Sequence, residues 1–218
     1  MIDPVPDFRA ALAALPLFPL PGAVLFPGAL LPLHVFEPRY QKLLADCLAT
    51  HRALAVVLVN SSGPVDDDGH PPIATVAGVG SIVEHEPLPE GRSYILVNGR
   101  ARVALEELPF SPPYRRAKAT LLPEPEVWTS ETDVAGLVHA AARFVSEVTK
   151  RGADAAFEPP SGLRPGELAD ACAQQLVLDA DVRQELLETL DANRRMRRVT
   201  EELMAQCTAL EIGGRTLH

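Results

Sequence analysis

A long stretch without charged residues constrains the fold of this chain more than any other feature. Residues 10–36 contain no Asp, Glu, Lys or Arg, and this is about the length that a membrane-spanning helix requires. Prolines interrupt the stretch every few residues, and a proline inside a helix removes a backbone donor and clashes with the preceding turn. A single extended segment cannot span a bilayer either, because its backbone polar groups would stay unpaired. The stretch therefore predicts short strands and turns in the core of a soluble domain.

The residues before this stretch argue against an export signal. The opening MIDPVPDFR carries Asp3 and Asp7 against a single Arg9, whereas a secretory signal has positive charge before its apolar segment. The three cysteines are far apart and odd in number, which indicates neither a disulfide framework nor a CxxC metal site. We therefore expect a cytoplasmic protein that has no cofactor.

Apolar runs bounded by Gly, Pro and Asn predict an antiparallel β region in the first half of the chain. Proline-glycine pairs at 21–22 and 27–28 predict turns, and Asn98-Gly99 predicts a tight hairpin turn because both residues tolerate positive φ. One helix is expected among the strands, over residues 38–50, where apolar residues repeat at helical spacing. The expected strands cover residues 15–20, 30–36, 53–59, 73–85, 94–97, 101–105 and 116–122.

After residue 125 the apolar period changes to 3.6, and four stripes predict four helices. Asp181 with Gln184 resembles a capping box at the start of the third of these helices. The basic run at 193–198 has glutamates nearby, so we interpret it as a solvated helical face. The predicted fold is α+β, with a barrel-like β lobe over residues 1–124 and a helical lobe over residues 125–218.

The sequence offers little that indicates catalysis. It has no Walker A motif, no GxGxxG after a strand, and only three lysines. Two clusters of potential metal ligands, at 66–70 and 84–86, lack the spacing of a metal site; in the second, the strand pattern points His85 away from both glutamates. The cysteines lie within or beside apolar helical stripes, which indicates buried thiols. We therefore expect that the chain is not an enzyme.

Several motifs resemble the N-terminal domain of ATP-dependent Lon proteases. LPLFPLPGAVLFPGALLPLHVFEPRY, at 15–40, resembles the start of that domain, with a Pro-Gly turn, then LPL, and FEPRY at the opening of a helix. GVGSIVEHEPLPEGRSYILVNGRARV, at 78–103, resembles its following strands, although Ser81 stands where Thr is usual. Residues 113–124 and 168–199 resemble its next strand and its helical tail. The order and spacing match over nearly the whole chain.

The resemblance implies a PUA-like antiparallel β-barrel lobe with one inserted helix, followed by a helical bundle lobe. In Lon this domain precedes an ATPase and a Ser-Lys protease domain, and we expect the chain, which ends at His218, to lack both. The implied role is a non-catalytic module that binds unfolded or tagged protein segments or a proteolytic complex and could serve as an adaptor for proteolysis, with no membrane partner. Open sheet edges, or a groove between strands and helices, would suit such segments.

Candidate binding residues are large and lie near the ends of proposed strands: Phe26, His34, Phe36 and Tyr94. Within FEPRY, we expect Glu37 near the positive end of the helix, Arg39 paired with a carboxylate of a neighbouring strand, and Tyr40 packed inward. The family-motif positions are interpreted as structural: Pro27, Gly28, Glu37, Pro38, Arg39, Tyr40, Gly80, Gly99 and Arg102.

Two other functions remain open at this stage. PUA-like barrels also occur in RNA-modifying enzymes, and RNA binding would use a basic face formed by Arg100, Arg102, Arg115, Arg116 and Lys118. The net charge of −9 argues against a nucleic-acid partner. A small hydrolase would use His34 or a cysteine in a pocket.

Overall fold

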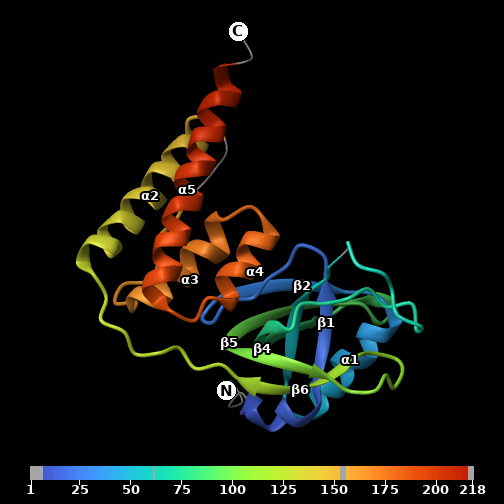
Figure 1. Ribbon diagram of the computed structural model, residues 1–218. Helices are drawn as coiled ribbons and strands as arrows, with labels where there is room; N and C mark the ends of the chain where they lie inside the picture. The colour runs from blue at the N-terminus through green and yellow to red at the C-terminus, as the bar shows by residue number, and fades with distance from the viewer. Residues whose placement is uncertain (1–6, 61, 153–155, 216–218) are drawn as a thin grey trace. The chain divides into compact units, whose positions relative to one another are not determined.

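The computed structural model describes residues 7–60, 62–152 and 156–215 (Figure 1). It divides into two compact units, Met1–Pro123 and Glu124–His218, each described here by itself. The first unit contains η1 (Phe8–Ala14), β1 (Leu15–Leu20), β2 (Leu30–Val35), α1 (Pro38–Ala49), β3 (Ala53–Leu58), β4 (Val76–Pro87), η2 (Pro89–Gly91), β5 (Ser93–Glu107) and β6 (Arg116–Leu121).

The strands form one six-stranded sheet with the order β2-β5-β4-β3-β1-β6. Because β6 also pairs with β5, strands β5, β4, β3, β1 and β6 form a closed ring of pairings, and β2 is attached to the outside of this ring through β5. All pairs are antiparallel except β1 with β3, which is parallel. The sequence prediction of a purely antiparallel sheet was wrong here, because β2 and α1 form the crossover that a parallel pair requires.

The buried strand β3 joins the two hydrophobic clusters of this unit. All six of its residues are buried. Leu54 and Val56 belong to a cluster that also holds Phe18, Val35 and residues of α1, whereas Ala53, Ala55 and Val57 belong to a second cluster with η1. Successive side chains of a strand point to opposite faces, so a strand that is covered on both faces is continuously apolar.

The pair Asn98-Gly99 does not form the predicted hairpin turn but lies inside the continuous strand β5. A Cβ atom at Gly99 would collide with the carbonyl oxygen of Phe26, and one at Gly78 would collide with that of Leu25. The glycines are thus required where the segment between β1 and β2 crosses the sheet, since only glycine permits such a close backbone approach. The predicted turns at 21–22 and 27–28 are confirmed, with positive φ at both glycines.

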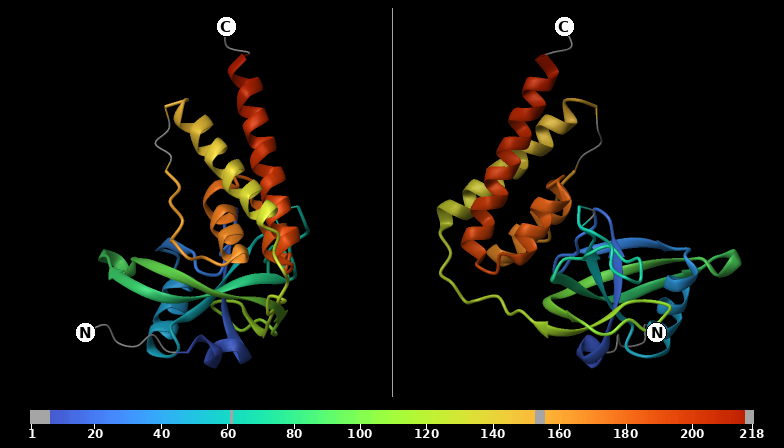
Figure 2. Two further views of the ribbon diagram at one scale, coloured as in Figure 1. Left: turned by 90° about the vertical axis from the view of Figure 1, so that its left-hand side faces the viewer. Right: turned by 45° about the vertical axis from the view of Figure 1, so that its right-hand side comes forward.

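The described residues of the second unit, 124–152 and 156–215, form four helices at the four positions where stripes predicted them: α2 (Glu131–Thr149), α3 (Pro165–Leu176), α4 (Ala180–Glu188) and α5 (Ala192–Arg215). Helices α2 and α5 run side by side in all views (Figures 1 and 2). The cap of α4 differs from the prediction, because the side chain of Asp179 accepts the backbone N–H groups of Asp181 and Val182. No described helix is long and apolar enough to cross a membrane.

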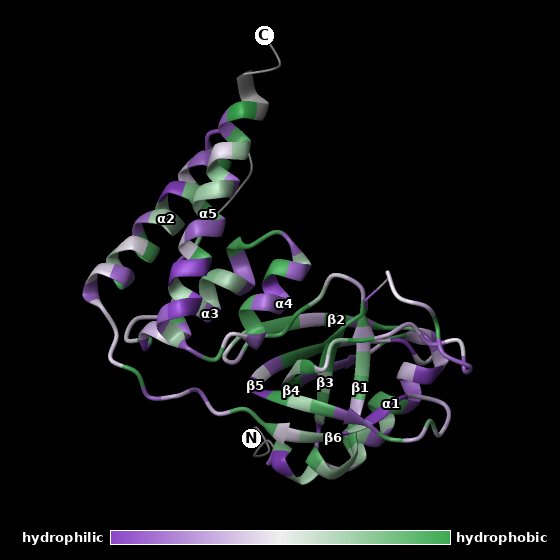
Figure 3. Cartoon of the chain, viewed as in Figure 1, coloured by the Kyte–Doolittle hydropathy of each residue, from purple (hydrophilic) through white to green (hydrophobic). Residues whose placement is uncertain are grey.

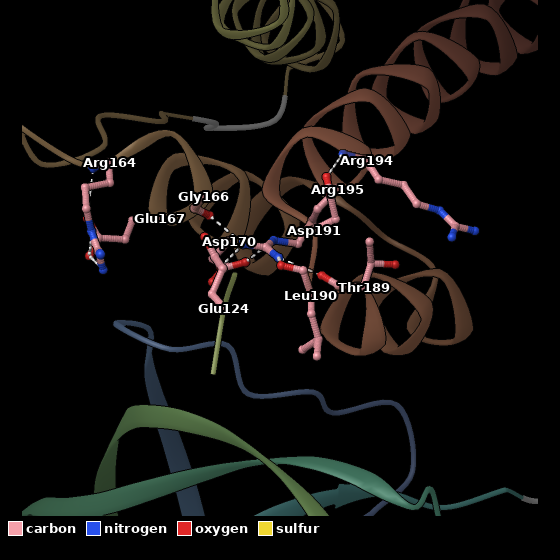
Figure 4. A network of polar contacts seen from close by, with 10 residues as sticks. All are labelled: Glu124, Arg164, Gly166, Glu167, Asp170, Thr189, Leu190, Asp191, Arg194 and Arg195. Carbon is pink, nitrogen blue, oxygen red and sulfur yellow. Dashed lines mark hydrogen bonds and ion pairs between the residues drawn. The ribbon is translucent and has the colours of Figure 1, made fainter. Parts of the chain in front are cut away.

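The basic run at the start of α5 is not a uniformly solvated face, as the sequence had suggested. Arg195 is fully buried, and its Nε lies 2.8 Å from a carboxylate oxygen of the buried Asp170 (Figure 4). The same guanidinium group forms an ion pair with Glu124 and donates hydrogen bonds to the carbonyl oxygens of Thr189 and Leu190. This network connects the start of the unit to α3 and α5.

Candidate functional site

An exposed cluster of three aromatic rings lies on the outer face of β2 and β5. In the sheet register, His34 of β2 is the direct partner of Tyr94 of β5. The His34 ring lies 4.8 Å from the Tyr94 ring and 5.5 Å from the Phe36 ring, measured between centroids. Tyr94 is 51% exposed and Phe36 is 57% exposed. The structure thus brings together three of the four side chains selected from the sequence.

The alternation of β2 explains why these rings face outward. Leu31, Leu33 and Val35 pack against the core, so the residues between them point to the opposite face. Figure 3 colours much of β2 as hydrophobic. Three further residues extend the apolar surface. Leu30 is 56% exposed, and Pro32 of β2 lies beside Leu96 of β5, which is its partner in the sheet register. We define the β2–β5 patch as Leu30, Pro32, His34, Phe36, Tyr94 and Leu96.

The fourth selected residue, Phe26, does not belong to this patch. Its side chain is fully buried, and the Arg102 guanidinium lies 5.8 Å from its ring centroid. Phe26 therefore cannot contact a ligand in this structure, because its side chain has no exposed surface. Leu30, Pro32 and Leu96 were not selected from the sequence, although the two-residue period of a strand places residues 30 and 32 on the same face as His34.

The FEPRY segment, residues 36–40, forms the start of helix α1. Glu37 is the N-cap residue of α1, and Pro38 occupies its first turn. Arg39 forms an ion pair with Glu37, at 2.7 Å, and not with a carboxylate of a neighbouring strand as the sequence had suggested. Tyr40 is buried and stacks on Phe18, with 4.4 Å between ring centroids. These contacts fix the start of α1 just after the exposed Phe36.

The cysteines do not offer a reactive thiol. All three are buried, and none lies in the β2–β5 patch. Burial raises the pKa of Cys47 and of Cys172 to about 12, so these groups stay protonated near neutral pH. This arrangement does not favour the hydrolase alternative, which requires a nucleophile with a positioned base.

The acidic loop between β3 and β4 brings potential metal ligands together, but local hydrogen bonds explain its geometry. Ligand atoms of Asp66, Asp68 and His70 lie within 4.8 Å of one another. The carboxylate of Asp66 accepts the backbone N–H groups of Asp68 and His70, at 3.1 and 2.7 Å. The His70 ring also packs against Phe110. The contacts close the loop without an ion.

The basic residues that an RNA-binding face would need are not gathered on one exposed surface. Arg102 is buried, at 4% exposure. The Arg115 side chain is 10% exposed and donates two hydrogen bonds to the Glu107 carboxylate. Lys118 forms an ion pair with Glu106. Two of the five basic residues are thus paired with glutamates and a third is buried, so the structure does not favour RNA binding.

Comparison with known proteins gives the family of this α+β chain. The family model of the ATP-dependent protease La (LON) substrate-binding domain matches residues 14–205. The chain therefore belongs to the Lon substrate-binding domain family, which confirms the resemblance seen in the sequence.

Relatives and solved structures agree with this assignment. The chain is 32% identical over 205 residues to Lon protease of Roseiflexus castenholzii, covering 91% of this chain and 25% of the relative. It is 29% identical over 204 residues to Lon protease 2 of Sorangium cellulosum, again covering 91% of this chain and 25% of the relative. The chain thus spans about a quarter of the length of these curated relatives.

Two solved structures share the mixed α+β fold. The Lon N-terminal domain protein from Xanthomonas campestris superposes with a TM-score of 0.63 at 21% identity, covering 85% of this chain and 96% of that chain. The N-terminal domain of the Mycobacterium avium complex Lon protease gives a TM-score of 0.61 at 16% identity, covering 88% and 98%.

Proposed function

We propose that this chain is a non-catalytic module that binds exposed apolar segments of other proteins through the β2–β5 patch. The observation that carries the proposal is the exposed aromatic cluster of His34, Phe36 and Tyr94 on a member of a substrate-binding family. Contiguous exposed apolar side chains mark interaction sites, and aromatic residues supply much of the binding energy at such sites.

The position of the patch suits an extended segment. Strand β2 pairs only with β5, so its other edge is open among the described strands. Pro32 lies in the middle of this strand, and edge strands tolerate proline because no ladder donor is needed there. A bound segment can therefore lie along β2 with its apolar side chains on the patch.

The wider role that we propose is recognition of unfolded or tagged proteins for an ATP-dependent protease in the cytoplasm, with the chain acting as an adaptor. The relatives named above are Lon proteases, which supports this choice of partner. We also propose that the closed ring of five strands is a PUA-like barrel and that the four helices form a bundle.

The binding proposal predicts a specific loss of affinity. The double variant Phe36→Ser with Tyr94→Ser should bind a reduced, carbamidomethylated unfolded protein about tenfold more weakly or worse, because two exposed aromatic contacts are lost. Fluorescence anisotropy of the labelled unfolded protein measures this change. The control Trp128→Ser removes the 83% exposed Trp128 of the other unit and should leave the affinity unchanged. Equal binding by the double variant and the wild type would refute the proposal.

A further inference from the structure

Two carboxylates lie beside the β2–β5 patch on the neighbouring strand β4. In the register of the sheet, Glu86 is the partner of Tyr94, and Glu84 is the partner of Leu96. Directly paired residues of antiparallel strands share one face of the sheet. His34, Tyr94 and Glu86 therefore form one row across three strands, and Pro32, Leu96 and Glu84 form a second row.

Neither carboxylate is neutralised within the described part of the chain. Glu84 and Glu86 are exposed and belong to no ion pair there. Arg92 pairs with Glu90 at 3.6 Å and Arg39 with Glu37 at 2.7 Å, and the Arg52 Nε donates a hydrogen bond to the carbonyl oxygen of Ile82 at 3.2 Å. His85, between the two glutamates, points to the other face, where its Nε2 lies 3.1 Å from the Ser93 hydroxyl. The apolar patch thus has a rim with two uncompensated negative charges.

The rim is also accessible. Both views of Figure 2 show the hairpin of β4 and β5 extending beyond the rest of the sheet. Neighbouring strands lie about 4.8 Å apart, so Glu84 and Glu86 of β4 are only one strand spacing from Leu96 and Tyr94 of β5. A Lys or Arg side chain of a segment that lies over Tyr94 and Leu96 can span this distance while its apolar neighbours contact the patch.

We propose that the β2–β5 patch selects extended protein segments in which aromatic or aliphatic residues are adjacent to Lys or Arg. This inference rests on the proposed function and specifies its substrate class. The apolar side chains occupy the patch, and the cations pair with Glu84 and Glu86. Segments with acidic flanks are disfavoured, because Glu84 and Glu86 repel their negative charges and the chain as a whole has a net charge of −9.

The test uses three labelled peptides that share one apolar core and carry flanks of Lys, Gln or Glu. The wild-type chain should bind the Lys peptide most tightly and the Glu peptide most weakly, with about a fivefold difference at each step, because exposed ion pairs contribute modestly. Raising the salt concentration should reduce the difference, since screening weakens exposed charges. Fluorescence anisotropy at low and high salt measures both effects.

Charge-reversal variants identify the residues responsible. Glu84→Lys with Glu86→Lys should invert the order of the three peptides, and Glu84→Gln with Glu86→Gln should abolish the preference. The control Asp67→Lys with Asp68→Lys produces the same change in net charge on the exposed loop between β3 and β4 and should keep the wild-type order.

The possible failures are distinguishable. If all three peptides bind the wild type equally, or if the reversed variant keeps the original order, the inferred selectivity is wrong while binding through the patch stands. If no peptide binds at either salt concentration, both the selectivity and the proposed function are wrong.

Discussion

Replacing Gly99 with alanine should lower the free energy of unfolding of the strand unit by about 3 kcal/mol, because overpacking at a rigid contact costs about this much. The added methyl group would meet the carbonyl oxygen of Phe26, and a backbone atom inside a folded sheet cannot move aside as the end of a flexible side chain can. Leu25 and Phe26, which approach Gly99 from the crossing segment, are fully buried, so the strain cannot relax into solvent. Thermal or urea unfolding followed by tyrosine near-UV circular dichroism reports on this unit, since all three tyrosines lie in it.

A second glycine supplies the control for this experiment. Gly136 lies within α2, and a Cβ atom built there has no neighbour within 4 Å. Gly136→Ala should therefore stabilise the helix by about 0.5–1 kcal/mol, the usual gain when alanine replaces glycine inside a helix. If Gly99→Ala unfolded at the same temperature as the wild type, the crossing of residues 25–26 over β5 would be wrong.

Replacing Arg195 with methionine should destabilise the helical unit by about 3–5 kcal/mol, because the change removes the guanidinium group that pairs with a buried carboxylate. Asp170 is only 3% exposed and lies 2.8 Å from the Arg195 Nε. The loss of the guanidinium also leaves the carbonyl oxygens of Thr189 and Leu190 without this donor. Urea unfolding followed by circular dichroism at 222 nm measures the change, since most of the helical residues belong to this unit.

The neighbouring Arg194 supplies a control that distinguishes the loss of a buried ion pair from the loss of a positive charge. Arg194→Met removes the same charge from an exposed position of α5 and should change the free energy of unfolding by less than about 0.5 kcal/mol. The double variant Arg195→Met with Asp170→Leu should recover part of the loss, because an apolar pair can replace a buried ion pair. Equal stability of the Arg195→Met and Arg194→Met variants would show that the buried network does not stabilise the unit.

Most helices and strands could be predicted from the sequence, because proline positions and apolar periodicity act on residues that are close together in the chain. Prolines exclude a helix from residues 15–36, and helical periodicity after residue 125 is a property of neighbouring turns. The exceptions depend on contacts between distant residues. Nothing local shows that Gly99 accommodates Phe26 rather than forming a turn, or that Arg195 meets Asp170 and is buried while Arg194 is exposed.

The candidate site could be predicted only in part for the same reason. Phe26 and Phe36 are both large residues near turns, and the sequence alone gave no reason to separate them. The structure separates them, because Phe26 belongs to the segment that crosses the sheet and is fully buried, while Phe36 is exposed just after the outer strand β2. Pairing of His34 with Tyr94 depends on the register between β2 and β5, which are separated by two strands and a helix along the chain.

The central claim is that the outer face of β2 and β5 binds the substrate segment. Amide hydrogen exchange of the whole chain, measured with and without a saturating unfolded protein, tests this claim directly. Exchange should become slower in residues 30–36 and 93–97 on binding, because a segment that lies along β2 covers the open edge and the patch. Protection confined to residues 131–212, with no change in residues 30–36, would contradict it.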